Sequence, residues 1–271
     1  MQQKFSGVKT MNYEELFVGW QNPSTRNWHT VGRVEYNTVS DSYRFSYTKG
    51  LLECIDDFTL FSGMSKLSSV YYSKQAFPFV QNRLLPKRRP EYKEFKSWLV
   101  DDMAEMSPLQ ELSYSGGIKG TDNLEFFTVP KETEGVYKYR FFVRGIRHLG
   151  KETISRIKEL EENETIYLMT DPQNIGDGNA VALRVDRPAT LIGYCPKYFS
   201  DDFSKLLIDK TCVNTIKAKI AKINVSAPFQ YRVAVDLVAE WPEGHKPFCN
   251  EQYDSLAEEI DLQKWMLESG L

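Results

Sequence analysis

A short polar segment near the middle of the chain constrains the fold more than any other feature. Residues 130–135 read PKETEG, so a proline and a glycine bracket four polar residues between two strand-like patterns. Clusters of this kind are typical of loops and domain boundaries. The chain has 271 residues, and domains commonly contain about 100–150 residues. We therefore expect two domains, 1–130 and 137–245, followed by an amphipathic helical tail at 246–271.

The first half has the pattern of an α+β domain, a small sheet with helices. Alternating apolar residues predict strands at 16–21, 28–36, 43–47 and 124–129. Helical spacing predicts helices at 73–84, 91–100 and 107–112. The strands at 28–36 and 43–47 are close enough to form a hairpin. Ser107 and Pro108 are typical N-cap and first-turn residues, and Gly116-Gly117 ends that helix.

The second half is richer in strands and predicts a small OB- or SH3-like β-barrel with two short helices. The expected strands are 138–145, 165–169, 180–185, 191–194, 213–223 and 231–239. The expected helices are 151–160 and 197–207. In the tail, Leu256, Ile260 and Trp265 share one helical face. That face either folds back onto the barrel or offers a surface to a protein partner.

Charge and hydropathy limit the classes of function. With 34 basic and 37 acidic residues the net charge is −3. Proteins that coat nucleic acid without specificity are usually strongly basic, so any nucleic-acid site here is small and local. No apolar run approaches the ~18 residues of a membrane span, and the first residues carry no signal-peptide core. We therefore expect a cytoplasmic protein without membrane contact. Four scattered cysteines predict buried, reduced thiols, and they are Cys54, Cys195, Cys212 and Cys249.

The sequence carries no motif that argues for catalysis. It has no GxxxxGK[ST] and no HExxH pattern. The three histidines, His29, His148 and His245, lack metal-ligand spacing. Gly116–Gly120 resembles a phosphate-binding loop, but a turn from helix to strand explains it better because a P-loop runs from strand to helix. We expect no enzyme, no cofactor and no metal.

Two basic clusters remain as candidate anion sites. One consists of Lys87, Arg88 and Arg89, which form either a solvated loop or a contact to phosphate or an acidic partner. The other comprises Arg144, Arg147, His148 and Lys151. This second cluster crosses from a strand end to a helix start, where cations beside free N–H groups suit a phosphate. It is equally compatible with an ordinary charged surface.

The loop Asp171–Asn179 is the most unusual segment, because Gly176 and Gly178 flank Asp177. Glycine permits positive φ and a close backbone approach. The Asp and Asn side chains either cap the turn or hydrogen-bond a ligand hydroxyl.

Three separated blocks carry a family resemblance. They are FFVRGIRH at 141–148, IYLMTDPQNIGDGNAVAL at 166–183 and LIGYCPKYFSDDFSKLL at 191–207. In this order they resemble the HIRAN domain. The resemblance implies binding of single-stranded DNA with a free 3′-hydroxyl end.

The resemblance also implies roles for individual residues. Arg147 and Lys197 would contact backbone phosphates, and His148 would stack on the terminal base. Asp177 would accept a hydrogen bond from the 3′-hydroxyl. Tyr194 and Asn179 complete the implied DNA-binding set, with Arg144 and Lys151 as secondary phosphate contacts.

One position departs from the family pattern. Gly176 stands where DNA-end binders have an aromatic residue that completes the base sandwich. A base stack is worth ~1–3 kcal/mol. Either the affinity is lower, or Tyr194, Tyr198 or another ring compensates, or DNA binding is lost.

The first half has a second resemblance. VGRVEY at 31–36, YRFSYTKG at 43–50, AFPFVQNRLLP at 76–86 and SPLQELSYSGGIKGTDNLEFF at 107–127 are similar to the first N-terminal subdomain of HipA-type kinases. No kinase core follows, so the arrangement looks like a bacterial two-module protein.

Two functions are compatible with these observations. The first is a non-catalytic DNA-end recognition module that recruits a protein partner through residues 1–130 or the tail, in repair or defence against foreign DNA. The alternative is a regulatory subunit, whose HipA-like half binds a separately encoded kinase or antitoxin and whose HIRAN-like half has lost DNA binding.

Overall fold

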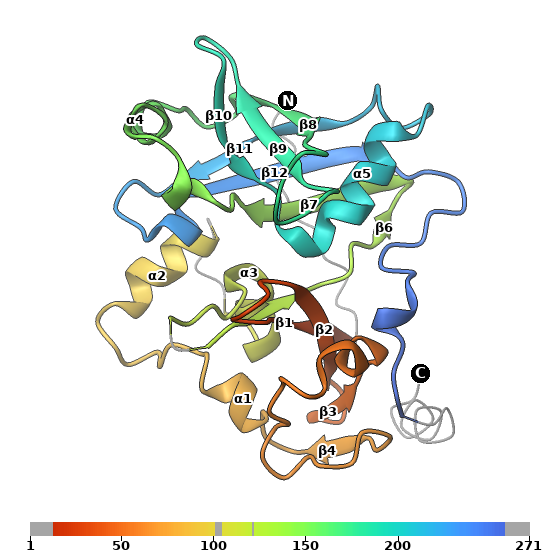
Figure 1. The fold of residues 1–271 in the computed structure, drawn as a ribbon. Coiled ribbons are helices and arrows are strands. Elements are labelled where there is room, and N and C mark those ends of the chain that lie inside the picture. Colours follow the sequence, from red (N-terminus) through yellow and green to blue (C-terminus); the bar gives the residue numbers. More distant parts are fainter. Residues whose placement is uncertain (1–12, 101–104, 121, 258–271) are drawn as a thin grey trace.

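The computed structural model describes residues 13–100, 105–120 and 122–257, which form two antiparallel sheets packed against each other (Figure 1). The first sheet contains five strands and the second seven. The chain passes from the first sheet to the second between Phe127 and Glu132, within the segment where the sequence predicts a boundary. The limits of the two domains stay a prediction.

The first sheet has the strand order β4-β3-β2-β1-β5. Its strands are β1 Tyr13–Gln21, β2 Trp28–Asn37, β3 Ser42–Tyr47, β4 Tyr71–Ser73 and β5 Leu124–Phe127. The predicted β2–β3 hairpin is confirmed, with Asn37 paired to Ser42. The Asn37 side-chain oxygen accepts from the amides of Val39 (2.8 Å) and Ser40 (3.0 Å), because an Asx turn closes this loop.

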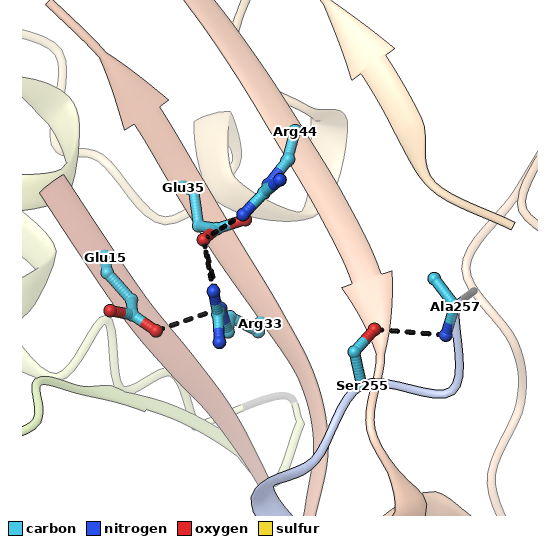
Figure 2. Close-up of polar contacts among 6 residues, drawn as sticks. All are labelled: Glu15, Arg33, Glu35, Arg44, Ser255 and Ala257. Carbon is cyan, nitrogen blue, oxygen red and sulfur yellow. Dashed lines mark hydrogen bonds and ion pairs between the residues drawn. The ribbon is translucent and has the colours of Figure 1, made fainter. Parts of the chain in front are cut away.

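A network of charged residues is buried in this sheet (Figure 2). Glu35 on β2 lies directly opposite Arg44 on β3 and pairs with it, and the Glu35 side chain is fully buried. Arg33 Nη2 lies 2.6 Å from Glu35 Oε1, and Arg33 Nε lies 2.9 Å from Glu15 Oε1. Each buried charge therefore has a partner of opposite sign, as burial in low dielectric requires.

Of the helices predicted in the first half, the one at 73–84 is shorter than predicted, the one at 91–100 matches closely, and the one at 107–112 extends to Ser115. They are α1 Pro78–Gln81, α2 Tyr92–Leu99 and α3 Pro108–Ser115, with a 3₁₀ turn at Lys49–Cys54. The predicted helix 73–84 is wrong at its start, because Tyr71–Ser73 pairs with β3 as an edge strand. In α3 the N-cap prediction is confirmed, since Ser107 Oγ accepts from Gln110 N at 3.1 Å and Gln110 completes a capping box.

The second sheet has the strand order β10-β9-β8-β11-β12-β7-β6. Its strands are β6 Glu132–Thr133, β7 Val136–Phe142, β8 Thr165–Thr170, β9 Val181–Val185, β10 Thr190–Tyr194, β11 Lys217–Ile223 and β12 Val233–Glu240. The two predicted helices are α4 Lys151–Lys158 and α5 Ser200–Ile208. Four 3₁₀ turns are η2 Ile146–His148, η3 Lys197–Phe199, η4 Phe229–Tyr231 and η5 Glu251–Tyr253.

The predicted barrel is not closed. Strand β10 meets the chain just beyond β7 at a single bridge, in which Arg144 N donates to Tyr194 O (2.8 Å) and Tyr194 N donates to Arg144 O (2.9 Å). No ladder continues from this bridge in the described residues, so the sheet curls without closing. Gly193 makes the approach possible, because a Cβ there would lie 2.4 Å from Arg144 O.

Aromatic side chains join the two sheets. Phe127 on β5 stacks on Tyr198 with ring centroids 4.2 Å apart, and Phe17 on β1 contacts Phe248 and Tyr253. On another side, α2 lies next to the second half (Figure 1), and Trp98 of this helix stacks on Tyr231. The rich aromatic content of the chain therefore fills cores and the contact between them.

The described part of the predicted tail contacts both halves. Phe248 packs on Phe199 of the second half with ring centroids 5.3 Å apart. Further along, at the first sheet, Lys49 N donates to Asp254 O and Leu256 N donates to Tyr47 O, both at 2.8 Å. Thr48 and Ser255 form a bridge there, and Ser255 Oγ accepts a hydrogen bond from Ala257 N at 3.0 Å (Figure 2). Strand β3 continues into Thr48, and its main-chain groups need partners there. The predicted helix positions Ile260 and Trp265 lie outside the described residues.

The cysteine prediction holds in part. Cys54, Cys195 and Cys212 are buried thiols, whereas Cys249 is exposed. In the described part of the chain no helix has the length and apolar character of a membrane span.

Candidate nucleic-acid site

Tyr194 at the end of β10 lies where three segments of the second half meet. Its main chain is bonded to Arg144, which leads into η2. Its hydroxyl donates to Asp171 Oδ2 at 3.0 Å, at the start of the loop Asp171–Asn179. Three residues further on, Lys197 begins η3. Sequence blocks that are widely separated in the chain therefore converge around one tyrosine.

Burial raises the pKa of Tyr194, and the hydrogen bond to Asp171 raises it further. The phenol therefore keeps its proton at neutral pH and remains a hydrogen-bond donor. Asp171 also accepts from Asn174 Nδ2 at 3.3 Å. These contacts fix the position of the ring and the start of the loop together.

The loop Asp171–Asn179 is held largely by its own polar groups. Asn174 Oδ1 accepts from Gly176 N (3.0 Å), and Asp177 Oδ1 accepts from Asn179 N (3.1 Å). Asn179 Nδ2 reaches Asp201 Oδ1 on α5 at 2.8 Å. Asp and Asn thus cap the turn, which is one of the two roles that the sequence left open. The Asp177 side chain is half-buried and Asn179 is exposed.

Lys197 ties η3 to this loop, since its ammonium donates to the carbonyl of Gly176 at 2.6 Å. The ammonium group has three donors, so this bond leaves two for a ligand. The Lys197 side chain is half-buried.

Arg147 and His148 are exposed on η2. Gly145, with φ of 78°, makes the turn that leads into η2, and Arg147 Nε donates to His148 Nε2 at 3.0 Å. Lys151 is exposed at the first position of α4. Within residues 13–100, 105–120 and 122–257, no carboxylate forms an ion pair with Arg147, Lys151 or Lys197.

Arg144 has a different environment from these cations. Its guanidinium pairs with the buried Glu125 of β5, and Nη1 donates to Gln230 O at 3.3 Å. Burial lowers the pKa of Arg144, but the charge of Glu125 and the contacts with Tyr198 and Tyr231 together raise it overall. Because the guanidinium is already paired with a carboxylate of the first sheet, Arg144 is not proposed as a phosphate contact.

Two further predicted candidates have other environments. Lys87, Arg88 and Arg89 are exposed in the loop between α1 and α2 of the first half. Lys87 Nζ lies 3.6 Å from Glu105. Tyr198, considered as a replacement base platform, packs its ring between the sheets on Phe127 and is not available for stacking on a base.

Sequence reasoning missed two residues of this region. Ile175, at the tip of the loop beside Gly176, is 105% exposed, and its signal was an apolar residue in a polar loop. Glu125 is a carboxylate inside the otherwise apolar strand LEFF. No group of three His, Cys, Asp or Glu side chains suited to a metal ion occurs in the described residues.

Comparison with known proteins identifies the second half. A family model for the HIRAN domain matches residues 136–241. Residues 136–241 form a HIRAN domain. The matched range begins with β7, ends just after β12 and contains the three segments that meet at Tyr194. It does not reach the first half, whose resemblance to HipA-type kinases is not supported.

Two solved structures are similar to the chain, and both have a TM-score of 0.31. One is the HIRAN domain of human HLTF, at 17% identity over 41% of this chain and 84% of that chain. The other is a protein from Lactobacillus plantarum, at 15% identity over 39% of this chain and 97% of that chain. No curated protein matches the chain.

Proposed function

We propose that the HIRAN domain binds single-stranded DNA at its 3′-hydroxyl end, around Tyr194. HIRAN domains are DNA-binding modules rather than catalytic ones, which supports DNA recognition by this chain. The observation that carries the proposal is that the segments bearing Arg147 and Lys197 meet at Tyr194, and that neither cation has a carboxylate partner among the described residues. Cations of this kind retain the capacity to bind phosphate.

Arg147 and Lys197 contact consecutive phosphates in this proposal. Arginine has five N–H donors, and the bond to His148 uses one of them. Lys197 contributes its two remaining donors without leaving the Gly176 carbonyl. Lys151, at the start of α4, extends the positive surface along the strand.

His148 and Tyr194 contact the terminal bases. Rings stack on any base, so this contact carries little sequence preference. With Gly176 in the position of the family's aromatic residue, Ile175 is the exposed apolar side chain beside it. We propose that Ile175 covers the second face of the terminal base, as aliphatic wedges do elsewhere.

Asp177 distinguishes the two kinds of 3′ end. A carboxylate accepts a hydrogen bond from a hydroxyl but repels a phosphate. One oxygen of Asp177 already accepts from the Asn179 amide, which holds the carboxylate in place. Asn179, fixed to Asp201 on α5, supports this arrangement.

Partner recruitment by residues 1–130 or the C-terminal tail stays a prediction. So do the regulatory-subunit alternative, the bacterial origin and the cytoplasmic location.

Fluorescence anisotropy tests the proposal with a labelled single-stranded oligonucleotide that ends in a 3′-hydroxyl or a 3′-phosphate. The hydroxyl end should bind more tightly, and Arg147→Ala should weaken its binding about tenfold, the effect of ~1.4 kcal/mol. Lys158→Ala is the matched control, because Lys158 is an exposed cation at the far end of α4. Equal binding of both ends would contradict the role of Asp177, and no binding of either would overturn the proposed function.

A further inference from the structure

One carboxylate of the first sheet contacts both segments that carry the proposed phosphate ligands. Glu125 on β5 has a side chain that is only 6% exposed. Its Oε1 accepts from the Tyr198 hydroxyl at 2.9 Å and also pairs with Arg144 Nη2. Tyr198 is 73 residues away in the sequence and Arg144 is 19. The contact is therefore purely tertiary and crosses from one sheet to the other.

The two donors are joined directly to the DNA site. Arg144 is bonded through its main chain to Tyr194 in both directions, and three residues later the chain reaches Arg147. Tyr198 is the residue after Lys197. Fixing the side chains of Arg144 and Tyr198 to a common oxygen therefore limits how far η2 and η3 can separate.

Neighbouring contacts hold the carboxylate against the HIRAN domain. Phe127, two residues along β5 and on the same face, stacks on the Tyr198 ring at an interplanar angle of 9°. Trp28 of β2 also contacts the Tyr198 ring edge-on, with the ring centroids 6.4 Å apart. Arg144 Nη1 donates to Gln230 O, which anchors the guanidinium from a third direction.

We infer that Glu125 is a positioning residue for the DNA site, which sets the spacing of Arg147 and Lys197 from the first sheet. The inference rests on the proposed function and adds a role for the first half. In this inference the first sheet helps to position the DNA-binding residues, whether or not it also binds a protein partner. A HIRAN domain separated from β5 would lack the contacts of Glu125 with Arg144 and Tyr198.

The test compares two buried carboxylates that have different hydrogen-bond partners. Glu125→Gln keeps an acceptor for Tyr198 but removes the charge that pairs with Arg144. Asp236→Asn is the matched control, because Asp236 on β12 is 5% exposed and its side-chain hydrogen bonds within the described residues go to Arg140 on β7, at 2.7 and 3.0 Å, rather than to η2 or η3. Amide hydrogen exchange of DNA-free protein and anisotropy with the 3′-hydroxyl oligonucleotide are measured for wild type and both variants.

Glu125→Gln should raise exchange at 144–148 and 194–198 and weaken DNA binding at least fivefold, whereas Asp236→Asn should change neither. Equal weakening by both variants, or unchanged exchange at both segments, would overturn the inference. If wild type binds no DNA, the proposed function fails, and the exchange data alone decide the positioning role. If Glu125→Gln does not fold, Tyr198→Phe removes one donor and keeps the ring stack. It should raise exchange at 194–198, and unchanged exchange there would contradict the inference.

Discussion

The first sheet and the HIRAN domain use charged residues in opposite ways. In the first sheet, Glu35 is fully buried and bonded to Arg33 and Arg44 (Figure 2). Around Tyr194, Arg147 is exposed, and the partner of Lys197 among the described residues is a neutral carbonyl. Paired charges in a sheet stabilise one arrangement of strands, while exposed, unpaired ones leave room for an anion. The comparison indicates that the bonding partner of a cation, more than its residue type, distinguishes a cation that stabilises the fold from one that can bind an anion.

The largest effect should come from breaking the buried network. Glu35→Ala leaves Arg44, whose side chain is 3% exposed, without its carboxylate, and we expect a loss of about 3–5 kcal/mol in the free energy of unfolding. Urea denaturation measures this change. Glu15→Ala is the matched control and should cost much less, because Glu15 is more exposed and pairs with Arg33 alone. A loss below about 1 kcal/mol for Glu35→Ala would contradict the structural role.

Asp202 on α5 extends the comparison to a buried carboxylate whose Oδ2 has no hydrogen-bond partner within the described residues. Burial raises its pKa from 3.8 to about 6. The protonated form is therefore favoured by folding, and this contribution is present below pH 4 and lost as the pH rises through 6.

The free energy of unfolding of wild type, relative to Asp202→Asn, should therefore fall by about 2 kcal/mol between pH 4 and pH 7. Urea titrations of both proteins at the two pH values measure it. If the difference in free energy of unfolding between the two proteins did not vary with pH, folding would not raise the pKa of Asp202, which would contradict the prediction.

Replacing the proposed phosphate contact Lys197 should change the free energy of unfolding less than replacing the buried Glu35 or Asp202. Lys197→Ala should weaken single-stranded DNA binding several-fold with little change in the free energy of unfolding, because its partner is a loop carbonyl. The slope of log K against log salt should become less steep by about 0.7, the value for one phosphate contact on a single strand. Anisotropy over a range of salt concentrations measures the slope. An unchanged slope would remove Lys197 from the phosphate contacts.

Local sequence patterns predicted much of the fold because local forces decide it. Alternation placed β2, β3 and β9 closely, and the Ser107–Gln110 capping box was visible as residue types. The short edge strand β4 was missed, since only its pairing with β3 stabilises Tyr71–Ser73 as a strand. Barrel closure depends on the relative path of distant strands, and no local pattern contains it.

For the candidate site, motifs identified the three segments, and the structure brings them together at Tyr194. What the sequence did not indicate was the partner of each side chain. Arg144 and Tyr198 have the residue types of DNA contacts, but Glu125 and Phe127 engage them across the two sheets. Such contacts depend on how the halves pack, so only the folded chain could separate them from Arg147 and Lys197.

Hydrogen exchange with and without the 3′-hydroxyl oligonucleotide tests the central claim most directly, because it reports both regions in one experiment. We expect the DNA to protect 145–151, 171–179 and 194–198, and to leave β2, β3 and the loop 87–89 unchanged. Protection confined to the first half, or bound DNA without protection around Tyr194, would contradict the account.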